Sequence, residues 1–227
     1  MVFIVNILGI LIYLTVLIVS IVIIECQFAL KGLQMIYIFF IILSQIMLNI
    51  YIDFLGHSLI LGSINFSMLF LIIDLINEKY GKHEANKVVW SGIFVLVLFL
   101  FQIFFVKYFA SKTDSYFVFL QLFGNQIRYI LIDIAVSYII FQFVNIAIFS
   151  FFKSIFKDSF LSLRCIFSTV LSQIGTAIVF YELCFFDQMT QNEIFEIIFN
   201  GMVIKVLVSL LEIPVLKFLK MRDTCGK

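Results

Sequence analysis

The chain has 227 residues, of which 63% are hydrophobic and 13% charged, and its formal net charge is +1. A sequence with so few polar residues cannot cover a soluble fold of this size, and so small a net charge provides no basic surface for DNA or RNA. The composition therefore excludes a soluble globular domain, argues against nucleic-acid binding, and indicates a polytopic membrane protein.

Seven apolar stretches are long enough, at about 20 residues each, to cross the hydrocarbon core as helices. The first has no basic residue before it and no cleavage-site pattern, so we expect it to be retained rather than removed as a signal peptide. The apolar runs are continuous rather than alternating, which argues against strands and a transmembrane barrel. In chain order, we expect helices at 3–25, 33–52, 58–77, 88–109, 124–151, 163–186 and 196–219.

The basic residues of the short loops predict the orientation. Two of them, Lys107 and Lys112, lie on one side of the membrane, and eleven lie on the side that holds the loop after the third helix. Because cytoplasmic loops carry the excess of Lys and Arg, we expect the N-terminus outside and the C-terminus in the cytoplasm. The eleven are Lys31, Lys79, Lys82, Lys87, Lys153, Lys157, Arg164, Lys217, Lys220, Arg222 and Lys227.

Neither the cysteines nor the histidines suggest a metal or redox site. Two histidines, His57 and His83, are too few for an ordinary zinc site. The four cysteines are widely spaced and form no CxxC pair. We therefore expect no metal and no cofactor, and we interpret the cysteines as small apolar side chains near helix ends: Cys26, Cys165, Cys184 and Cys225.

Polar side chains inside the predicted spans mark the inner faces of the helices, because the bilayer offers them no water. Lys205 lies near the middle of the seventh span, where an ammonium costs roughly 3 kcal/mol and is normally met by a partner or ligand. Gln173 lies at a similar depth, where either a helix-helix hydrogen bond or recognition of a polar heterocycle explains it. The inward-facing set is Asn49, Asp74, Glu78, Asp133, Gln142, Asn145, Gln173, Lys205 and Glu212.

Charged residues also lie at the ends of two spans. Asp74 and Glu78, four residues apart, share a helix face at the cytoplasmic end of the third span, where they repel unless a cation, water or a donor-rich ligand meets them. Alternatively, Glu78 is exposed in the loop and pairs with Lys82. Arg128 opens the fifth helix too far round from Asp133 to pair with it, and snorkelling to the outer interface is one explanation for it.

Several motifs follow one another in register. The stretch 66–90 (FSMLFLIIDLINEKYGKHEANKVVW) is an apolar helix that ends in Asp-x-x-x-Glu, an aromatic residue and Gly before a short basic loop. Over roughly 33–221, this arrangement resembles the vitamin uptake transporter-like (VUT, YhhQ-type) family of queuosine precursor transporters. The other matching features are Asn49 before the signature, Arg128 opening a long helix, the Ser-x-x-x-Ser-Gln helix at 159–180, and KVLVSLLEIP at 205–214.

The resemblance implies an all-α polytopic bundle of six family helices, here with one extra N-terminal transmembrane helix at 1–30 that we interpret as an accessory anchor. The transporter domain is then 31–221, followed by a short cytoplasmic tail at 222–227. The implied function is uptake of a 7-deazaguanine such as preQ0, preQ1 or queuine across the bacterial inner membrane for tRNA modification. Such a carrier is not an enzyme, needs no cofactor, and has a small heterocyclic substrate and the lipid bilayer as partners.

The resemblance also implies a central substrate site. Asp74 and Glu78 accept donor groups or gate the cytoplasmic end. Gln173 bonds the base edge, and Lys205 neutralises Asp74 or holds a carbonyl oxygen. Thr176 stands where the family usually has an Asp, which leaves the exact precursor open. The expected substrate-binding residues are Asn49, Asp74, Glu78, Arg128, Gln173, Thr176 and Lys205.

Two other classes of function compete with a transporter. A membrane binding subunit, similar to a vitamin-capturing S-component, would dock an energising module through small residues, and Ser168, Ser172, Gly175 and Thr176 recur at a spacing that also suits close helix packing. An intramembrane enzyme is disfavoured, because the sequence has no HExxH and no nucleophile with a base at fixed spacing. A carrier for another polar heterocycle, a homo-oligomer and a partner-driven system stay open.

Overall fold

The computed structural model describes residues 2–48, 50–54, 57–109, 112–119, 123 and 138–156, together with single positions between 167 and 219. Its described elements are mainly helices, and four of them are long and apolar enough to cross a membrane. The expected all-α bundle is therefore confirmed. The expected number of seven helices stays a prediction, because much of 124–137, 163–186 and 196–219 lies outside the described residues.

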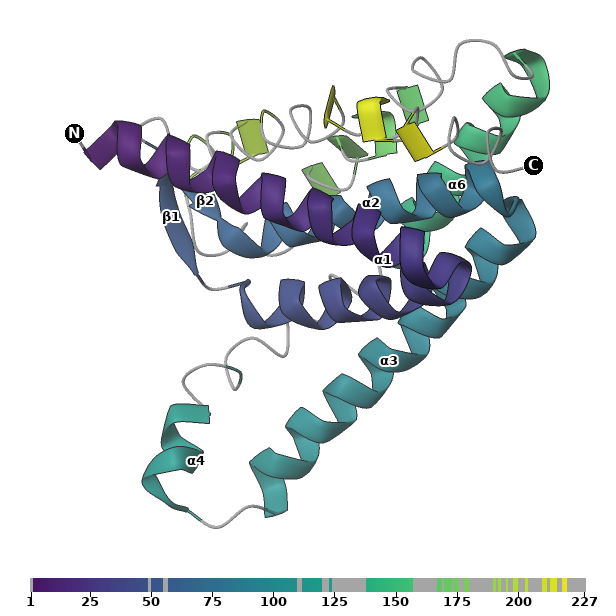
Figure 1. Ribbon diagram of the computed structural model, residues 1–227. Helices are drawn as coiled ribbons and strands as arrows, with labels where there is room; N and C mark the ends of the chain where they lie inside the picture. Colours follow the sequence, from purple (N-terminus) through teal and green to yellow (C-terminus); the bar gives the residue numbers. More distant parts are fainter. Residues whose placement is uncertain are drawn as a thin grey trace.

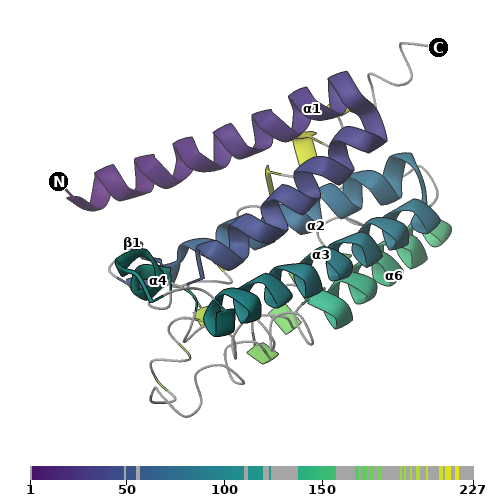
Figure 2. The same cartoon turned by 90° about the horizontal axis from the view of Figure 1, so that it is seen from below.

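Helix α1 (Val2–Ile46) folds back on itself, so it accounts for two of the predicted spans. Its 45 residues would reach about 67 Å if straight, more than twice the hydrocarbon core. The break is at Ala29, whose φ of 51° is unusual for a residue with a side chain. A Cβ on Gly32 would lie 2.8 Å from the Phe28 Cβ, so glycine permits the tight return. Figures 1 and 2 show the two arms of this hairpin.

A small β-hairpin follows α1, where helix was expected. Strands β1 (Tyr51–Phe54) and β2 (His57–Ile60) pair antiparallel, with Tyr51 opposite Ile60. The predicted span 33–52 therefore ends too late and the predicted span 58–77 begins too early, because 51–52 and 58–60 are strand. Aromatic and β-branched residues favour strands, and a short apolar run cannot be assigned to helix or strand by periodicity alone.

Helix α2 (Leu61–Lys79) is the central helix of the described bundle. It packs against α1, α3 and α6, and nearly all of its residues from Gly62 to Asn77 are buried. Its start lies against the end of α1, where a Cβ on Gly62 would lie 2.6 Å from the Ser44 carbonyl oxygen. A helix of this length spans about 28 Å, close to the thickness of the hydrocarbon core. Any polar residue on α2 is thus held away from lipid.

Helix α3 (Lys82–Phe109) begins six residues before the predicted span at 88–109. Gly81, with φ of 89°, makes the turn from α2, and Glu84 lies in the first turn of α3, where the helix dipole favours an acid. The short helix α4 (Asp114–Phe119), which was not predicted, lies at the same end of the bundle as the β-hairpin (Figure 1).

Helix α6 (Ile139–Phe156) forms the second half of the predicted span 124–151 and continues five residues beyond it. One face is buried, and it carries Gln142, Asn145, Ile146 and Phe149 at helical spacing. Just before α6, Tyr138 donates a hydrogen bond to the Tyr37 hydroxyl of α1 at 2.8 Å and lies 3.2 Å from the Val89 carbonyl of α3. Gly92 of α3 leaves room for this tyrosine, because a Cβ there would overlap its hydroxyl.

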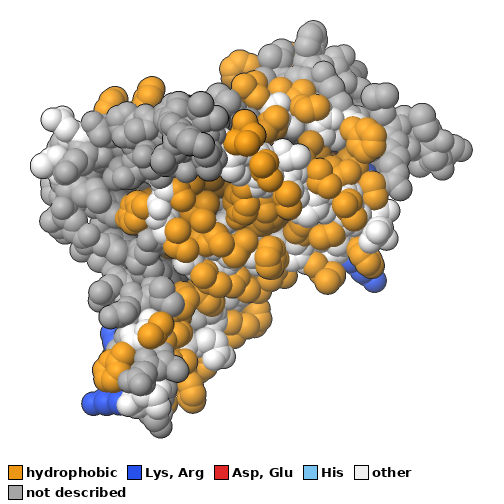
Figure 3. All heavy atoms as spheres, turned by 60° about the vertical axis from the view of Figure 1, so that its left-hand side comes forward, with side chains coloured by type: hydrophobic (Ala, Val, Ile, Leu, Met, Phe, Trp, Pro, Cys, Tyr) orange, Lys and Arg blue, Asp and Glu red, His pale blue; other side chains and the backbone are white. Residues whose placement is uncertain are grey.

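The outer surface of the bundle is apolar, as expected for helices in lipid. Large hydrophobic side chains are exposed along α3, among them Phe94, Phe101 and Phe105. Figure 3 shows a described surface that is mostly hydrophobic, with basic side chains at its margins. This distribution fits a multi-pass membrane protein.

Candidate functional site

Several buried polar side chains of the bundle lie on the C-terminal half of α2 and on the inner face of α6. The two helices run in the same direction, since Asp74 meets Asn145 and, further along both helices, Glu78 meets Lys153. Polar residues at successive turns of α2 thus meet polar residues at successive turns of α6. This paired arrangement is the candidate site.

Asp74 is completely buried at the centre of this arrangement. The Nδ2 of Asn145 donates to one carboxylate oxygen at 2.6 Å, and the Ser168 hydroxyl lies 3.4 Å from the other. A carboxylate offers about four lone-pair positions, so Asp74 can also accept N–H groups of a ligand.

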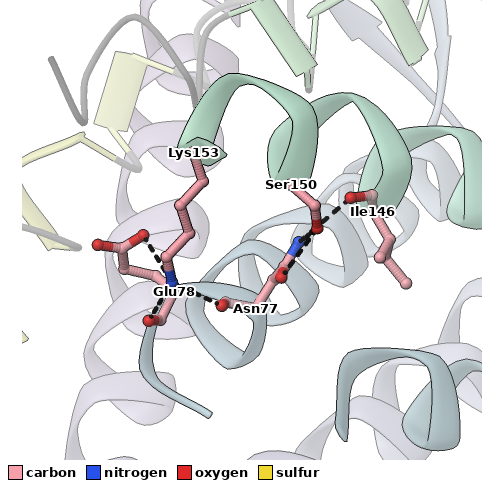
Figure 4. A network of polar contacts seen from close by, with 5 residues as sticks. All are labelled: Asn77, Glu78, Ile146, Ser150 and Lys153. Carbon is pink, nitrogen blue, oxygen red and sulfur yellow. Dashed lines mark hydrogen bonds and ion pairs between the residues drawn. The ribbon is translucent and has the colours of Figure 1, made fainter. Parts of the chain in front are cut away.

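Asn77 lies one turn beyond Asp74 and fastens α2 to α6. Its Nδ2 donates to the Ile146 carbonyl at 3.3 Å and lies 3.1 Å from the Ser150 hydroxyl, which in turn lies 3.3 Å from the Asn77 Oδ1 (Figure 4). The Ile146 carbonyl already serves the α6 backbone, so Asn77 uses its second lone pair. These contacts fix the register of the two helices beside Asp74.

Glu78 lies at the end of the site where α2 ends. Its carboxylate pairs with Lys153 of α6 at 3.4 Å, and its side chain is only 4% exposed. Lys153 also donates to the backbone carbonyls of Asn77 and Glu78, at 3.1 and 2.7 Å, where the end of α2 favours a cation (Figure 4). The alternative in which Glu78 is exposed in the loop and pairs with Lys82 is therefore wrong.

On its other side, α2 is bound to the first arm of α1. The Tyr13 hydroxyl donates to the Asn65 Oδ1 at 2.7 Å, and Glu25 forms a buried ion pair with Lys79. The two contacts are separated by 12 residues on α1 and 14 on α2, so they join the helices near both ends of the membrane-spanning length. The first arm is thus packed into the bundle and is more than an external anchor.

Some of the small residues of the predicted sixth span lie against α2 and α6, and the Ser168 hydroxyl lies beside Asp74. Ser168 and Ser172 are completely buried, and a Cβ on Gly175 would overlap the Phe141 ring of α6. Phe167 and Leu171 of the same segment are exposed. The predicted close helix packing is confirmed at these positions.

Of the expected site residues, Asp74 and Glu78 are described, and both are buried in the network. Sequence reasoning missed Glu25, Asn77, Ser150 and Lys153 as members of polar contacts. The position of Asn77, one turn from Asp74, could have indicated that it belongs to the network. Lys153 was assigned only to a loop. The remaining expected residues lie outside the described part of the chain: Asn49, Arg128, Gln173, Thr176 and Lys205.

Gln142 is a further polar residue on the inner face of α6. It is completely buried, and neither atom of its amide has a hydrogen-bond partner among the described residues. Burying an amide without a partner costs about 1–3 kcal/mol. Among the described residues, no group of three His, Cys, Asp or Glu side chains is placed to hold a metal ion.

The chain was compared with known proteins. Residues 60–219 match the family described as "Putative vitamin uptake transporter". The matched residues include α2, α3, α6 and the polar network between them. The chain belongs to this family of membrane transporters. It is also 29% identical over 166 residues, 72% of each chain, to the "Probable queuosine precursor transporter" of Bacillus subtilis (strain 168). No solved structure matches.

Membership of the vitamin uptake transporter family confirms the family resemblance and a transport function rather than an enzymatic one. The matched region begins at residue 60, so α1 and β1 precede it. The contacts of Tyr13 and Glu25 therefore join the family region to a segment outside that match.

Proposed function

We propose that this transporter imports a queuosine precursor, a 7-deazaguanine such as preQ0, preQ1 or queuine, across the bacterial inner membrane for tRNA modification. The similarity to the Bacillus subtilis protein supports this substrate class. The structural observation that carries the proposal is the completely buried Asp74 carboxylate, which is held by Asn145 and Ser168.

Asp74 suits a guanine-like ligand because such a base presents several N–H donors on one edge. A carboxylate accepts hydrogen bonds only, and inside a bundle each such bond is stronger than in water. Thr176 replaces the acid that the family usually has in the sixth span, so we assign the role of acidic acceptor to Asp74. Gln173 and Lys205 complete the proposed site, together with the other expected residues Asn49, Arg128 and Thr176.

Glu78 and Lys153 form the cytoplasmic gate in this proposal. Their pair lies one turn from Asp74 and joins α2 to α6, so separating the two helices there requires breaking it. The orientation is supported by the described lysines. Lys79, Lys82 and Lys153 lie at the end of the bundle where α2 ends, whereas Lys107 lies at the opposite end of α3.

The proposal is tested by uptake of labelled preQ1 in a bacterial strain that lacks its own carrier. Unlabelled preQ0, queuine and guanine serve as competitors, and an uncoupler shows whether a proton gradient drives accumulation. Lys205→Ala and Gln173→Ala should abolish uptake while the protein stays in the membrane. Normal uptake by both variants would remove these two residues from the site.

A binding subunit that docks an energising module through the small residues of the predicted sixth span is less well supported. Ser168 and Ser172 are buried within the chain, and the Ser168 hydroxyl lies 3.4 Å from the Asp74 carboxylate of α2. A docking face must be accessible to the partner. The burial of Ser168 and Ser172 therefore supports transport by the chain alone.

A further inference from the structure

Gln142 of α6 has a polar side chain that the described protein does not use. It is completely buried, and its Oε1 and Nε2 both lack a hydrogen-bond partner among the described residues. Buried amides in folded proteins almost always have partners, because an unpaired one loses its water without compensation. Leucine or methionine would fill a similar volume at no such cost. The described part of the bundle therefore gives no structural reason for an amide at this position.

The neighbouring atoms indicate what the amide faces. Gln142 precedes Asn145 by three residues, so the two side chains lie on the same face of α6, one turn apart. Asn145 donates its Nδ2 to Asp74, and its Oδ1 has no hydrogen-bond partner among the described residues. One face of α6 thus carries an unused donor and acceptor on Gln142 and, beside them, an unused acceptor on Asn145.

We propose that Gln142 binds the substrate through a pair of hydrogen bonds and that Asn145 supports it from the next turn. This rests on the proposed function and deepens it. A planar amide offers one donor and one acceptor side by side, which matches a ring lactam, a carbonyl next to an N–H. The Gln142 Nε2 donates to the ring carbonyl, and its Oε1 accepts the adjacent ring N–H. The Asn145 Oδ1 and Asp74 accept the amino group beside them.

The proposed arrangement selects heterocycles by their lactam edge. A guanine-like ring satisfies both atoms of Gln142. A ring whose lactam nitrogen carries a methyl group leaves the Oε1 without a partner and places the methyl group against it. A buried polar group left unpaired by the wrong ligand is a strong source of discrimination. We therefore expect Gln142 to determine how strongly methylation at this nitrogen weakens binding.

Binding can be measured on the purified full-length protein in detergent, by the rise in its unfolding temperature with increasing preQ1 or N1-methyl-preQ1. We expect the wild type to bind preQ1 at least about tenfold more tightly than its methylated form. Gln142→Leu should bind preQ1 about 10–100-fold more weakly and bind the two ligands with nearly equal affinity. Its unfolding temperature without ligand should be unchanged or higher, because an unpaired amide has been removed.

Gln102→Leu is the matched control, because Gln102 is an exposed glutamine on α3. It should bind both ligands as the wild type does. Gln142→Met is a second variant with an unbranched side chain, and it should behave as Gln142→Leu does, which guards against a misfolded leucine variant.

Three results would overturn the inference. If the wild type binds preQ1 and both Gln142 variants keep its affinity and its discrimination, Gln142 does not contact the substrate, while the proposed function stands. If both variants unfold at a much lower temperature without ligand, the amide has a structural partner instead. If the wild type binds no deazaguanine at all, the proposed function fails, and the inference fails with it.

Discussion

Glu25 of α1 and Lys79 of α2 form an ion pair in which the two side chains are only 5% and 8% exposed. Lys79 directly follows Glu78, whose own partner is Lys153 of α6. Two adjacent residues of α2 therefore hold two different helices at the same end of the bundle. The first arm of α1, which precedes the matched family region, is one of them.

Glu25→Gln should destabilise the bundle, because it leaves the Lys79 ammonium buried without a counter-charge. Breaking a buried pair in this way costs about 3–5 kcal/mol. For a chain of this length, we expect the unfolding temperature in detergent to fall by roughly 6 °C or more. The reversed pair, Glu25→Lys with Lys79→Glu, should restore most of the loss.

Glu84→Gln is the control for this experiment, because Glu84 pairs within α3 with Lys87, whose side chain is 56% exposed. A surface pair contributes at most about 1 kcal/mol, so its loss should change the unfolding temperature little. If Glu25→Gln and Glu84→Gln unfold at the same temperature, the pair between α1 and α2 contributes nothing to stability.

Asp74→Asn should lower uptake at least about tenfold while the protein remains in the membrane. Asparagine has nearly the same shape, so Asn145 and Ser168 can still pack against it, but the charge that strengthens hydrogen bonds to a ligand is lost. The measurement is initial uptake of labelled substrate, normalised to the amount of protein in the membrane. Uptake equal to that of the wild type would show that the carboxylate of Asp74 is only structural.

Much of the fold could be predicted from the sequence, because length and hydropathy decide which segments cross a bilayer. Asp74, Gln142 and Asn145 were correctly placed on inner faces by the same physics, and all three are completely buried. The β-hairpin was missed because its strands are only four residues each and stand between long apolar helices. The partners of Glu25 and Glu78 were missed for another reason. Hydropathy along one helix does not tell which other helix lies beside it.

Gly92→Ala should destabilise the junction of α1, α3 and α6, because the new Cβ would overlap the hydroxyl of buried Tyr138. Overpacking of this kind costs about 1–3 kcal/mol. Tyr138 cannot easily withdraw, since it is hydrogen-bonded to Tyr37. In a Tyr138→Phe background the same substitution should cost less, which a double-mutant cycle of unfolding temperatures measures.

Gly9→Ala is the matched control for Gly92→Ala, because a Cβ on Gly9 would meet no heavy atom within 4 Å. Alanine is also the better helix former, so this variant should be as stable as the wild type or slightly more so. If Gly92→Ala lowers the stability equally in the wild type and in the Tyr138→Phe background, the proposed overlap is contradicted.

Uptake of labelled preQ1 into cells that lack their own carrier tests the central claim most directly. We expect cells that produce this protein to accumulate the label, and unlabelled preQ0 or queuine to reduce the accumulation. Cells that produce the Asp74→Asn variant at the same membrane level should accumulate at least about tenfold less. If the wild-type protein is present in the membrane and no deazaguanine accumulates or competes, the assignment as a queuosine precursor transporter is wrong.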